Sequence, residues 1–152
     1  MSEILVVYFS AEGTTAKLAK DIASAYEADI FEIVPVQPYT KSEINWLNPL
    51  SRCNKEMLGK KDVPVAGNIE NFDQYSKVII CFPIWYGAQP NVVSTFLKDY
   101  DFNGKEVYVY ATSGGSRIGK TAEKIGPYVE GAEIKDAFVV KSVDEVKERM
   151  GD

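Results

Sequence analysis

The chain has 152 residues, the length of one domain, and its 45% hydrophobic and 26% charged residues are ordinary for a globular protein. Its net charge of −5 argues against a general nucleic-acid-binding protein and disfavours approach to anionic membranes. It contains no histidine, which excludes Ser-His-Asp and Cys-His catalytic sites and His-ligated metal centres. Any redox chemistry must then come from a bound cofactor.

The two cysteines do not form a CxxC pair, and without histidine they make no zinc site of the usual kind. Cys81 lies within an apolar strand pattern, so we predict a buried structural thiol there. No basic segment followed by an apolar stretch opens the chain, and no apolar run approaches ~18 residues. We therefore expect a cytoplasmic protein that does not bind nucleic acid or membranes.

The first part of the chain is predicted to form a strand, a helix and a second strand. Ile4–Phe9 is continuously apolar or aromatic, as in a strand covered on both faces. Thr15–Tyr26 places its apolar side chains at helical spacing. Asp29–Val34 is a more polar strand, which we expect at the edge of a sheet.

A long segment without clear regular structure follows, from Pro35 to Ser76. Four prolines interrupt it, and only Ser51–Leu58 hints at a helix. A segment of this length is typical of a functional loop, a lid or an irregular crossover. Regular patterns then resume with an apolar strand, Val78–Phe82, and a helix, Pro90–Tyr100, with proline at its start.

The last third alternates in the same way. Val107–Ala111 and Ala137–Val140 are predicted strands. Gly119–Val129 is a weaker helix that Gly126-Pro127 should break or kink. Ser142-x-x-Glu145 is a capping box that opens a final helix.

This alternation predicts an α/β fold: one doubly wound domain over residues 1–152, with a five-stranded parallel sheet in the order 2-1-3-4-5 and helices on both faces. Ligands of such sheets bind outside the carboxyl ends of the strands, where the strand order reverses. The loops that meet there read SAEGTT (10–15), PIWYGAQP (83–90) and TSGGSRIG (112–119).

Each loop has two interpretations. In the first, hydroxyl groups at the start of a helix either hold an anion through neutral donors, or Thr14 simply caps the helix. In the second, Trp85 and Tyr86 beside Gly87 either stack on a flat ring or pack within the protein. In the third, Gly114-Gly115 either offers backbone amides to a ligand or forms an ordinary turn. Together the loops fit a ligand with a flat ring, a polar chain and a terminal phosphate, which describes FMN.

The stretches YFSAEGTTAKLAKDIA, FPIWYGAQPNVVSTFLKDYDFNGKEV and TSGGSRIGKT resemble the flavodoxin family, specifically its short bacterial flavodoxin-like branch. The resemblance covers nearly the whole chain and implies FMN as cofactor. It implies phosphate contacts at Ser10, Glu12 (through its amide), Gly13, Thr14 and Thr15. It implies ring contacts at Pro83, Ile84, Trp85, Tyr86 and Gly87, and at Thr112, Ser113, Gly114 and Gly115 on the pyrimidine side.

Two features depart from the familiar electron-transfer flavodoxins. The loop after the fourth strand lacks the tyrosine that stacks on the outer face of the flavin, so that face is open or covered by another group, for which Trp46 is a candidate. Alternatively, Trp46 is a hydrophobic anchor for the long segment that contains it. Glu12 would repel a phosphate unless its side chain points to water.

Three functions are compatible with these residues. The favoured one is an FMN-binding electron carrier that docks on a reductase and an acceptor protein, with FMN supplying one- and two-electron chemistry. The second is an FMN-dependent NAD(P)H quinone or nitro reductase, against which the short loop after the fourth strand counts. The third is a flavin-free binding module on the same fold.

Overall fold

The computed structural model of the chain describes residues 3–9, 14–35, 65–66, 69, 72–84, 91–98, 100–112, 125–140 and 142–150. Five parallel strands form the main sheet, in the order β2-β1-β5-β6-β7. The strands are β1 (Ile4–Tyr8), β2 (Asp29–Glu32), β5 (Lys77–Pro83), β6 (Glu106–Thr112) and β7 (Glu133–Val139). This is the predicted order 2-1-3-4-5, and it confirms the flavodoxin-like fold class.

The middle strands are covered on both faces, as their continuous apolar sequences indicate. In β5, five successive residues, Val78–Phe82, are fully buried. Since side chains alternate across a strand, each middle strand contributes to two separate hydrophobic clusters.

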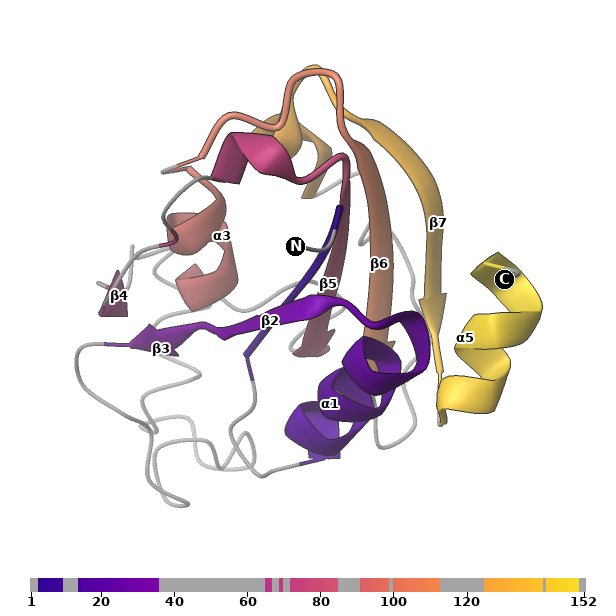
Figure 1. Ribbon diagram of the computed structural model, residues 1–152. Coiled ribbons are helices and arrows are strands. Elements are labelled where there is room, and N and C mark those ends of the chain that lie inside the picture. Colours follow the sequence, from indigo (N-terminus) through magenta and orange to yellow (C-terminus); the bar gives the residue numbers. More distant parts are fainter. Residues whose placement is uncertain are drawn as a thin grey trace.

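Helices lie on both faces of the sheet (Figure 1). On one face, α1 (Thr14–Tyr26) and α5 (Val143–Met150) cover a cluster that includes Val6 and Ile79. On the other face, α3 (Asn91–Leu97) and two short 3₁₀ helices, η1 (Phe72–Gln74) and η2 (Gly126–Val129), cover a larger cluster. The two faces are the ones that the alternation of strands and helices predicts.

The two edge strands are more polar than the middle ones. The expectation that Asp29–Val34 lies at an edge is confirmed, although β2 ends at Glu32. The other edge strand, β7, begins at Glu133, four residues before the predicted start at Ala137. Its first residues alternate between exposed and half-buried positions and include charged side chains. This part of the strand therefore lacks the continuous apolar run by which strands were predicted.

A second, two-stranded sheet was not predicted. In it β3 (Val34–Pro35), which begins at the last residue of the predicted strand Asp29–Val34, pairs antiparallel with β4 (Val65–Ala66), which lies within the segment that showed no clear strand. Two-residue strands are too short to show a periodic pattern. Trp46, Cys53 and the hint of a helix at Ser51–Leu58 lie outside the described residues.

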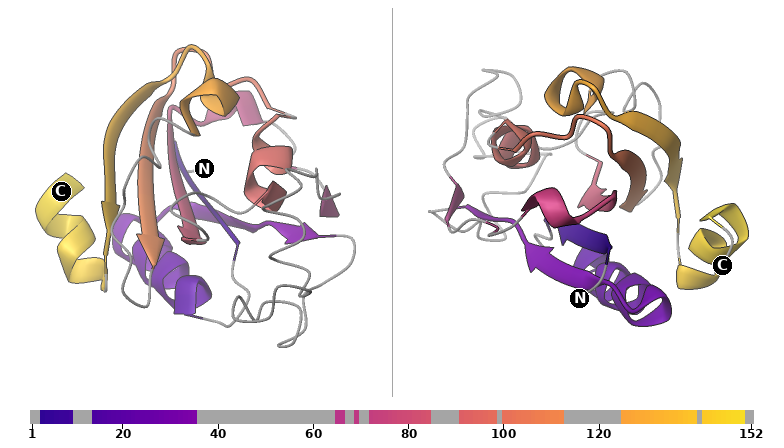
Figure 2. Two further views of the ribbon diagram at one scale, coloured as in Figure 1. Left: turned by 180° about the vertical axis from the view of Figure 1, so that it is seen from behind. Right: turned by 45° about the horizontal axis from the view of Figure 1, so that its top comes forward.

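The helices fall where the sequence patterns predict them, although α3 ends at Leu97, three residues before the predicted end at Tyr100. α1 begins one residue before the predicted Thr15, and α5 follows directly on the expected cap Ser142. Gly126-Pro127 starts the 3₁₀ helix η2, which agrees with the predicted break; residues 119–124 lie outside the described part of the chain. Figure 2 shows α5 next to β7, at one end of the sheet.

Candidate functional site

The carboxyl ends of β1, β5 and β6 lie at one edge of the sheet, and hydrogen bonds hold them in register. The amide of Phe9 donates to the carbonyl of Cys81 (3.0 Å), and the amide of Ile84 donates to the carbonyl of Thr112 (3.0 Å). These bonds continue the parallel ladder past the last residues of β1 and β5. The starting points of the three candidate loops are therefore fixed relative to one another.

Thr15 occupies the buried face of α1, near the start of the helix. It lies three, four and seven residues before Leu18, Ala19 and Ile22, which pack on the sheet, so the helical period turns it inward. Thr15 is only 2% exposed. A hydroxyl at such a position needs a hydrogen-bond partner inside the protein.

That partner is Thr112, the last residue of β6. Thr112 follows Tyr108 and Tyr110 at intervals of two, which turns its side chain to the face that α1 covers. The Oγ1 atoms of Thr15 and Thr112 lie 2.7 Å apart, in a buried hydrogen bond between residues 97 positions apart in the chain. The first turn of α1 is thereby tied to the beginning of the third candidate loop.

Ile84 completes the connection. Its amide bonds to the Thr112 carbonyl, and its half-buried side chain packs against the larger hydrophobic cluster. Pro83, the last residue of β5, pairs with Thr112 in the sheet register. Thr112 thus contacts α1 through its side chain and the end of β5 through its backbone.

The electrostatic setting at the start of α1 suits an anion. The first turn of α1 carries no acidic residue, and the first amides of a helix have no partners within the helix. Burial, with a smaller contribution from Glu32, raises the pKa of the Tyr8 phenol at the end of β1, so Tyr8 is neutral at physiological pH. The nearby Cys81 thiol is fully buried, and burial raises its pKa to about 12. The prediction of a buried structural thiol is confirmed.

Five of the predicted site residues fall within the described part of the chain: Thr14, Thr15, Pro83, Ile84 and Thr112. The structure brings the last four together, and Thr14 is the first residue of α1. The others lie outside the described residues: Ser10, Glu12, Gly13, Trp85, Tyr86, Gly87, Ser113, Gly114 and Gly115.

Sequence reasoning missed the pairing of Thr15 with Thr112. Two signals were present: Thr15 shares the helical face of Leu18 and Ile22, and Thr112 shares the strand face of Tyr110. Leu18 and Ile22 are apolar, and the Tyr110 hydroxyl already donates to a carboxylate of β7. Two buried hydroxyl groups on facing surfaces of this kind favour a mutual hydrogen bond.

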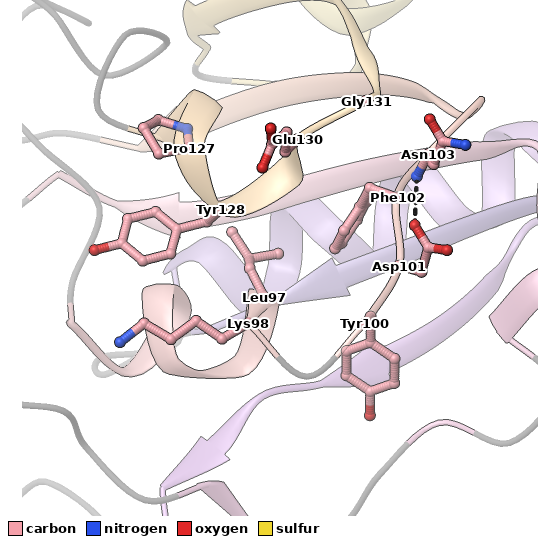
Figure 3. Close-up of a pocket in the computed structure, with 10 residues that line it drawn as sticks. All are labelled: Leu97, Lys98, Tyr100, Asp101, Phe102, Asn103, Pro127, Tyr128, Glu130 and Gly131. Atoms are coloured by element: carbon pink, nitrogen blue, oxygen red, sulfur yellow. Dashed lines mark hydrogen bonds between the residues drawn. The ribbon is translucent and has the colours of Figure 1, made fainter.

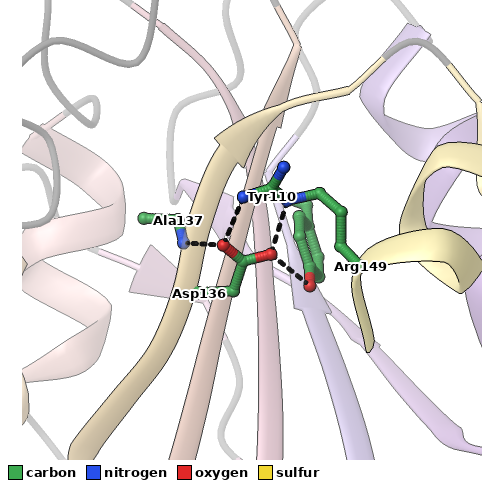
Figure 4. A network of polar contacts seen from close by, with 4 residues as sticks. All are labelled: Tyr110, Asp136, Ala137 and Arg149. Carbon is green, nitrogen blue, oxygen red and sulfur yellow. Dashed lines mark hydrogen bonds and ion pairs between the residues drawn. The ribbon is translucent and has the colours of Figure 1, made fainter. Parts of the chain in front are cut away.

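A polar network on the same face of the sheet joins β6, β7 and α5 (Figure 4). The carboxylate of Asp136 accepts hydrogen bonds from the Tyr110 hydroxyl (3.0 Å), from the Ala137 amide (3.0 Å) and from Arg149. The Arg149 guanidinium holds the pKa of Asp136 below its usual value. Burial first, and then the hydrogen bond to Asp136, raise the pKa of Tyr110 far above its ordinary value. The network is a structural support for α5.

A pocket of about 630 Å³ lies at the opposite end of β6 (Figure 3). Its walls come from the end of α3, the loop before β6 and the η2 region, with Lys98, Asp101, Tyr128 and Glu130 among the lining residues. The seven residues of β6 separate it from Thr112, and such a strand spans roughly 20 Å. The pocket is therefore not part of the candidate site.

Among the described residues, no group of three Cys, Asp or Glu side chains gathers closely enough to hold a metal ion. None of the helices in that part of the chain has the length and apolar character needed to cross a membrane.

The fold defines a doubly wound α/β protein, with a buried pair of threonine hydroxyls at the carboxyl edge of its sheet. Comparison with known families agrees, because the chain matches the flavodoxin family over residues 3–150. The chain therefore belongs to the flavodoxin family. No curated protein matches it significantly.

Solved structures extend the comparison. A protein of Bacteroides eggerthii DSM 20697, provisionally described as a flavoprotein, is 35% identical with a TM-score of 0.87, over 97% of this chain and 95% of that one. A similarly described protein of Bacteroides uniformis ATCC 8492 is 33% identical with a TM-score of 0.85, over 95% of each chain. A flavoprotein of Lactobacillus acidophilus NCFM, crystallised in complex with FMN, shares the fold at 21% identity and a TM-score of 0.72, over 98% of this chain and 99% of that one.

Proposed function

We propose that this protein binds FMN at the carboxyl edge of its sheet and acts as an electron carrier between redox proteins. FMN, when bound, would supply the one- and two-electron chemistry, which no side chain of this histidine-free chain replaces. The protein would bind the cofactor, orient it and limit its contact with water.

The observation that carries the proposal is the hydrogen bond between Thr15 and Thr112. Together with the bond from the Ile84 amide to the Thr112 carbonyl, it holds the first turn of α1 beside the ends of β5 and β6. FMN has a phosphate and a flat ring that must be bound at the same time, so its site needs these loops to start close together. The FMN complex of the Lactobacillus acidophilus flavoprotein, which shares the fold, gives further support.

The phosphate would lie at the start of α1. There, unpaired helix amides and hydroxyl groups can donate to a doubly negative group without help from a lysine or arginine. The described residues fit this role, because the first turn of α1 carries no carboxylate and Thr15 supplies a neutral hydroxyl. The proposed contacts are Ser10, Gly13, Thr14, Thr15 and the amide of Glu12.

The ring would lie against the ends of β5 and β6. An aromatic pair on a loop can stack on a flat ring, and backbone amides can bond to its polar edge. The proposed contacts are Pro83, Ile84, Trp85, Tyr86 and Gly87 on the first side, and Thr112, Ser113, Gly114 and Gly115 on the pyrimidine side.

The proposed partners are a reductase and an acceptor protein in the cytoplasm. The net charge of −5 favours docking on basic surfaces of such proteins, because complementary charge speeds encounter. Electron transport of this kind needs no substrate pocket beyond the flavin site.

A titration tests the cofactor assignment. Apo-protein is titrated with FMN and with riboflavin, and binding is followed by quenching of flavin fluorescence. Since the proposed site holds the phosphate, FMN should bind much more tightly than riboflavin. Equal affinities would overturn the phosphate site.

Trp85→Ala should shift the reduction potential of bound FMN, and an unchanged potential would remove Trp85 from the ring contacts.

A second measurement separates the carrier from a reductase. The FMN-loaded protein alone is mixed with NADPH in air, and absorbance at the NADPH band is followed. A carrier should oxidise NADPH slowly unless a reductase is added. Rapid oxidation by the protein alone would favour an FMN-dependent NAD(P)H reductase instead.

A further inference from the structure

The direction of the Thr15–Thr112 hydrogen bond matters for the candidate site. Either hydroxyl can donate in the free protein. A hydroxyl group has one hydrogen and two lone pairs, so it donates once and accepts up to twice. A phosphate near neutral pH carries most of its negative charge on acceptor oxygens. A threonine that contacts phosphate must therefore give its hydrogen to the phosphate and accept from its other neighbours.

We propose that Thr112 is a positioning residue for the phosphate half of the site. In this arrangement Thr112 Oγ1 donates to Thr15 Oγ1, which leaves the Thr15 hydrogen for the phosphate. Thr112 touches Thr15 rather than the phosphate and acts through it. The inference rests on the proposed FMN site and adds a role to Thr112 besides the pyrimidine-side contact that the family resemblance implies.

The burial of the pair supports this role. Thr15 is 2% exposed and Thr112 is 9% exposed, so neither hydroxyl can easily exchange its partner for water. A bound anion that takes the Thr15 hydrogen then requires Thr112 to supply the hydrogen between the two oxygens. Without the Thr112 hydroxyl, Thr15 would lose the neighbour that fixes its orientation.

The backbone around Thr112 is also fixed. Its carbonyl accepts from the Ile84 amide (3.0 Å), and Thr112 pairs with Pro83 in the sheet. The strand therefore presents the Thr112 hydroxyl to α1 at a set distance. Preorganised donors lose little entropy when a ligand binds, which is the benefit expected of a positioning residue.

The test compares FMN with riboflavin in a set of variants, again by fluorescence quenching. Thr112→Val removes the hydroxyl at nearly constant shape and should lower the preference for FMN over riboflavin roughly fivefold, as for one net hydrogen bond, because a lost ring contact weakens both ligands and cancels in this ratio. Thr112→Ser keeps the hydroxyl and should retain most of the FMN affinity. The double variant Thr15→Val/Thr112→Val should prefer FMN over riboflavin no less than Thr15→Val alone, because Thr112 acts on the phosphate through Thr15.

Two results would overturn the inference. An equal loss of affinity for both ligands in Thr112→Val would mean that Thr112 acts on the ring or on the fold. Unchanged affinity for both would mean that the pair only ties α1 to β6. Thermal unfolding of each apo-variant checks that it is folded, and Thr112→Ala gives the same comparison if valine does not fit. Failure of wild-type protein to prefer FMN would instead overturn the proposed function, so the two failures are distinguishable.

Discussion

Arg149 in α5 donates two hydrogen bonds to the Asp136 carboxylate of β7, from Nε to Oδ2 at 2.6 Å and from Nη2 to Oδ1 at 2.8 Å (Figure 4). The same guanidinium lies over the Phe138 ring, 3.8 Å from its centroid. A planar group that bonds a carboxylate through two nitrogens holds both orientation and distance. The final helix is thus attached to the edge strand by one side chain with two kinds of contact.

Removing that side chain should loosen α5. Arg149→Met keeps an apolar stem and should lower the free energy of unfolding at pH 7 by about 1–2 kcal/mol, since the pair is only partly shielded from water. Arg149→Lys should recover a minor part, because an ammonium cannot bond both oxygens in the same way. Urea unfolding followed by circular dichroism measures this. The exposed neighbour Glu148→Gln is the control, and equal losses in both would contradict the role of Arg149.

The same pair predicts an acid dependence of stability. Arg149 lowers the pKa of Asp136 in the folded protein from its ordinary 3.8. Between the folded and unfolded pKa values the unfolded chain binds more protons, so stability rises with pH there. The contribution is complete above about pH 4 and is lost as pH falls through the folded pKa. The melting temperature of wild type should therefore fall more steeply below about pH 4 than that of Asp136→Asn; parallel curves would refute this.

Lys105 is a buried cation in the loop before β6, and its removal should destabilise the amino end of the sheet. Its Nζ donates to the carbonyls of Phe72 (3.3 Å) and Tyr75, and lies 4.9 Å from the centroid of the Phe72 ring. Lys105→Met would leave those carbonyls without this donor, at a loss of about 2 kcal/mol. The half-exposed Lys77→Met, whose ion pair with Glu106 spans 3.9 Å, should cost less than about 1 kcal/mol. Equal losses in urea unfolding would count against this assignment.

Cys81 should be chemically inert while the protein is folded. Burial raises its pKa to about 12, so the thiol stays protonated at pH 8, and burial also blocks reagents. In a Cys53→Ser background, reaction with a disulfide reagent such as dithionitrobenzoate should be slow, and it should accelerate with urea as unfolding begins. Reaction at the rate of a free thiol in native protein would show that Cys81 is accessible.

The sequence predicted the middle of the fold better than its edges. β5 and β6 extend beyond the predicted runs Val78–Phe82 and Val107–Ala111 by one residue at each end, since burial on both faces leaves a continuous apolar signal. β7 was predicted too short because an edge strand is half exposed. Near the start of β7, its pairing with β6 also shifts in register, between Val107 and Tyr108 of β6. The alternation of exposed and half-buried side chains along β7 is interrupted as a result.

The candidate site was predictable as a location but not as a set of contacts. Parallel strands bring their carboxyl ends together, so loops 10–15, 83–90 and 112–119 could be assigned to one edge from the strand order alone. The bond from Thr15 to Thr112 depends on how α1 rotates on the sheet, which only the packing of Leu18 and Ile22 decides. The helical period predicts that Thr15 faces the sheet, and the alternation along β6 predicts that Thr112 faces α1. Neither pattern gives the distance between the two hydroxyl groups.

The contact between Arg149 and Phe138 has a consequence for self-association. Phe138 is 40% exposed on an edge strand, where an uncovered aromatic ring invites pairing with another molecule. Arg149 places a positive charge over that ring, and Glu133 and Lys135 add exposed charges along the same strand. The side chain that fastens the last helix therefore also shields the open side of the sheet from aggregation.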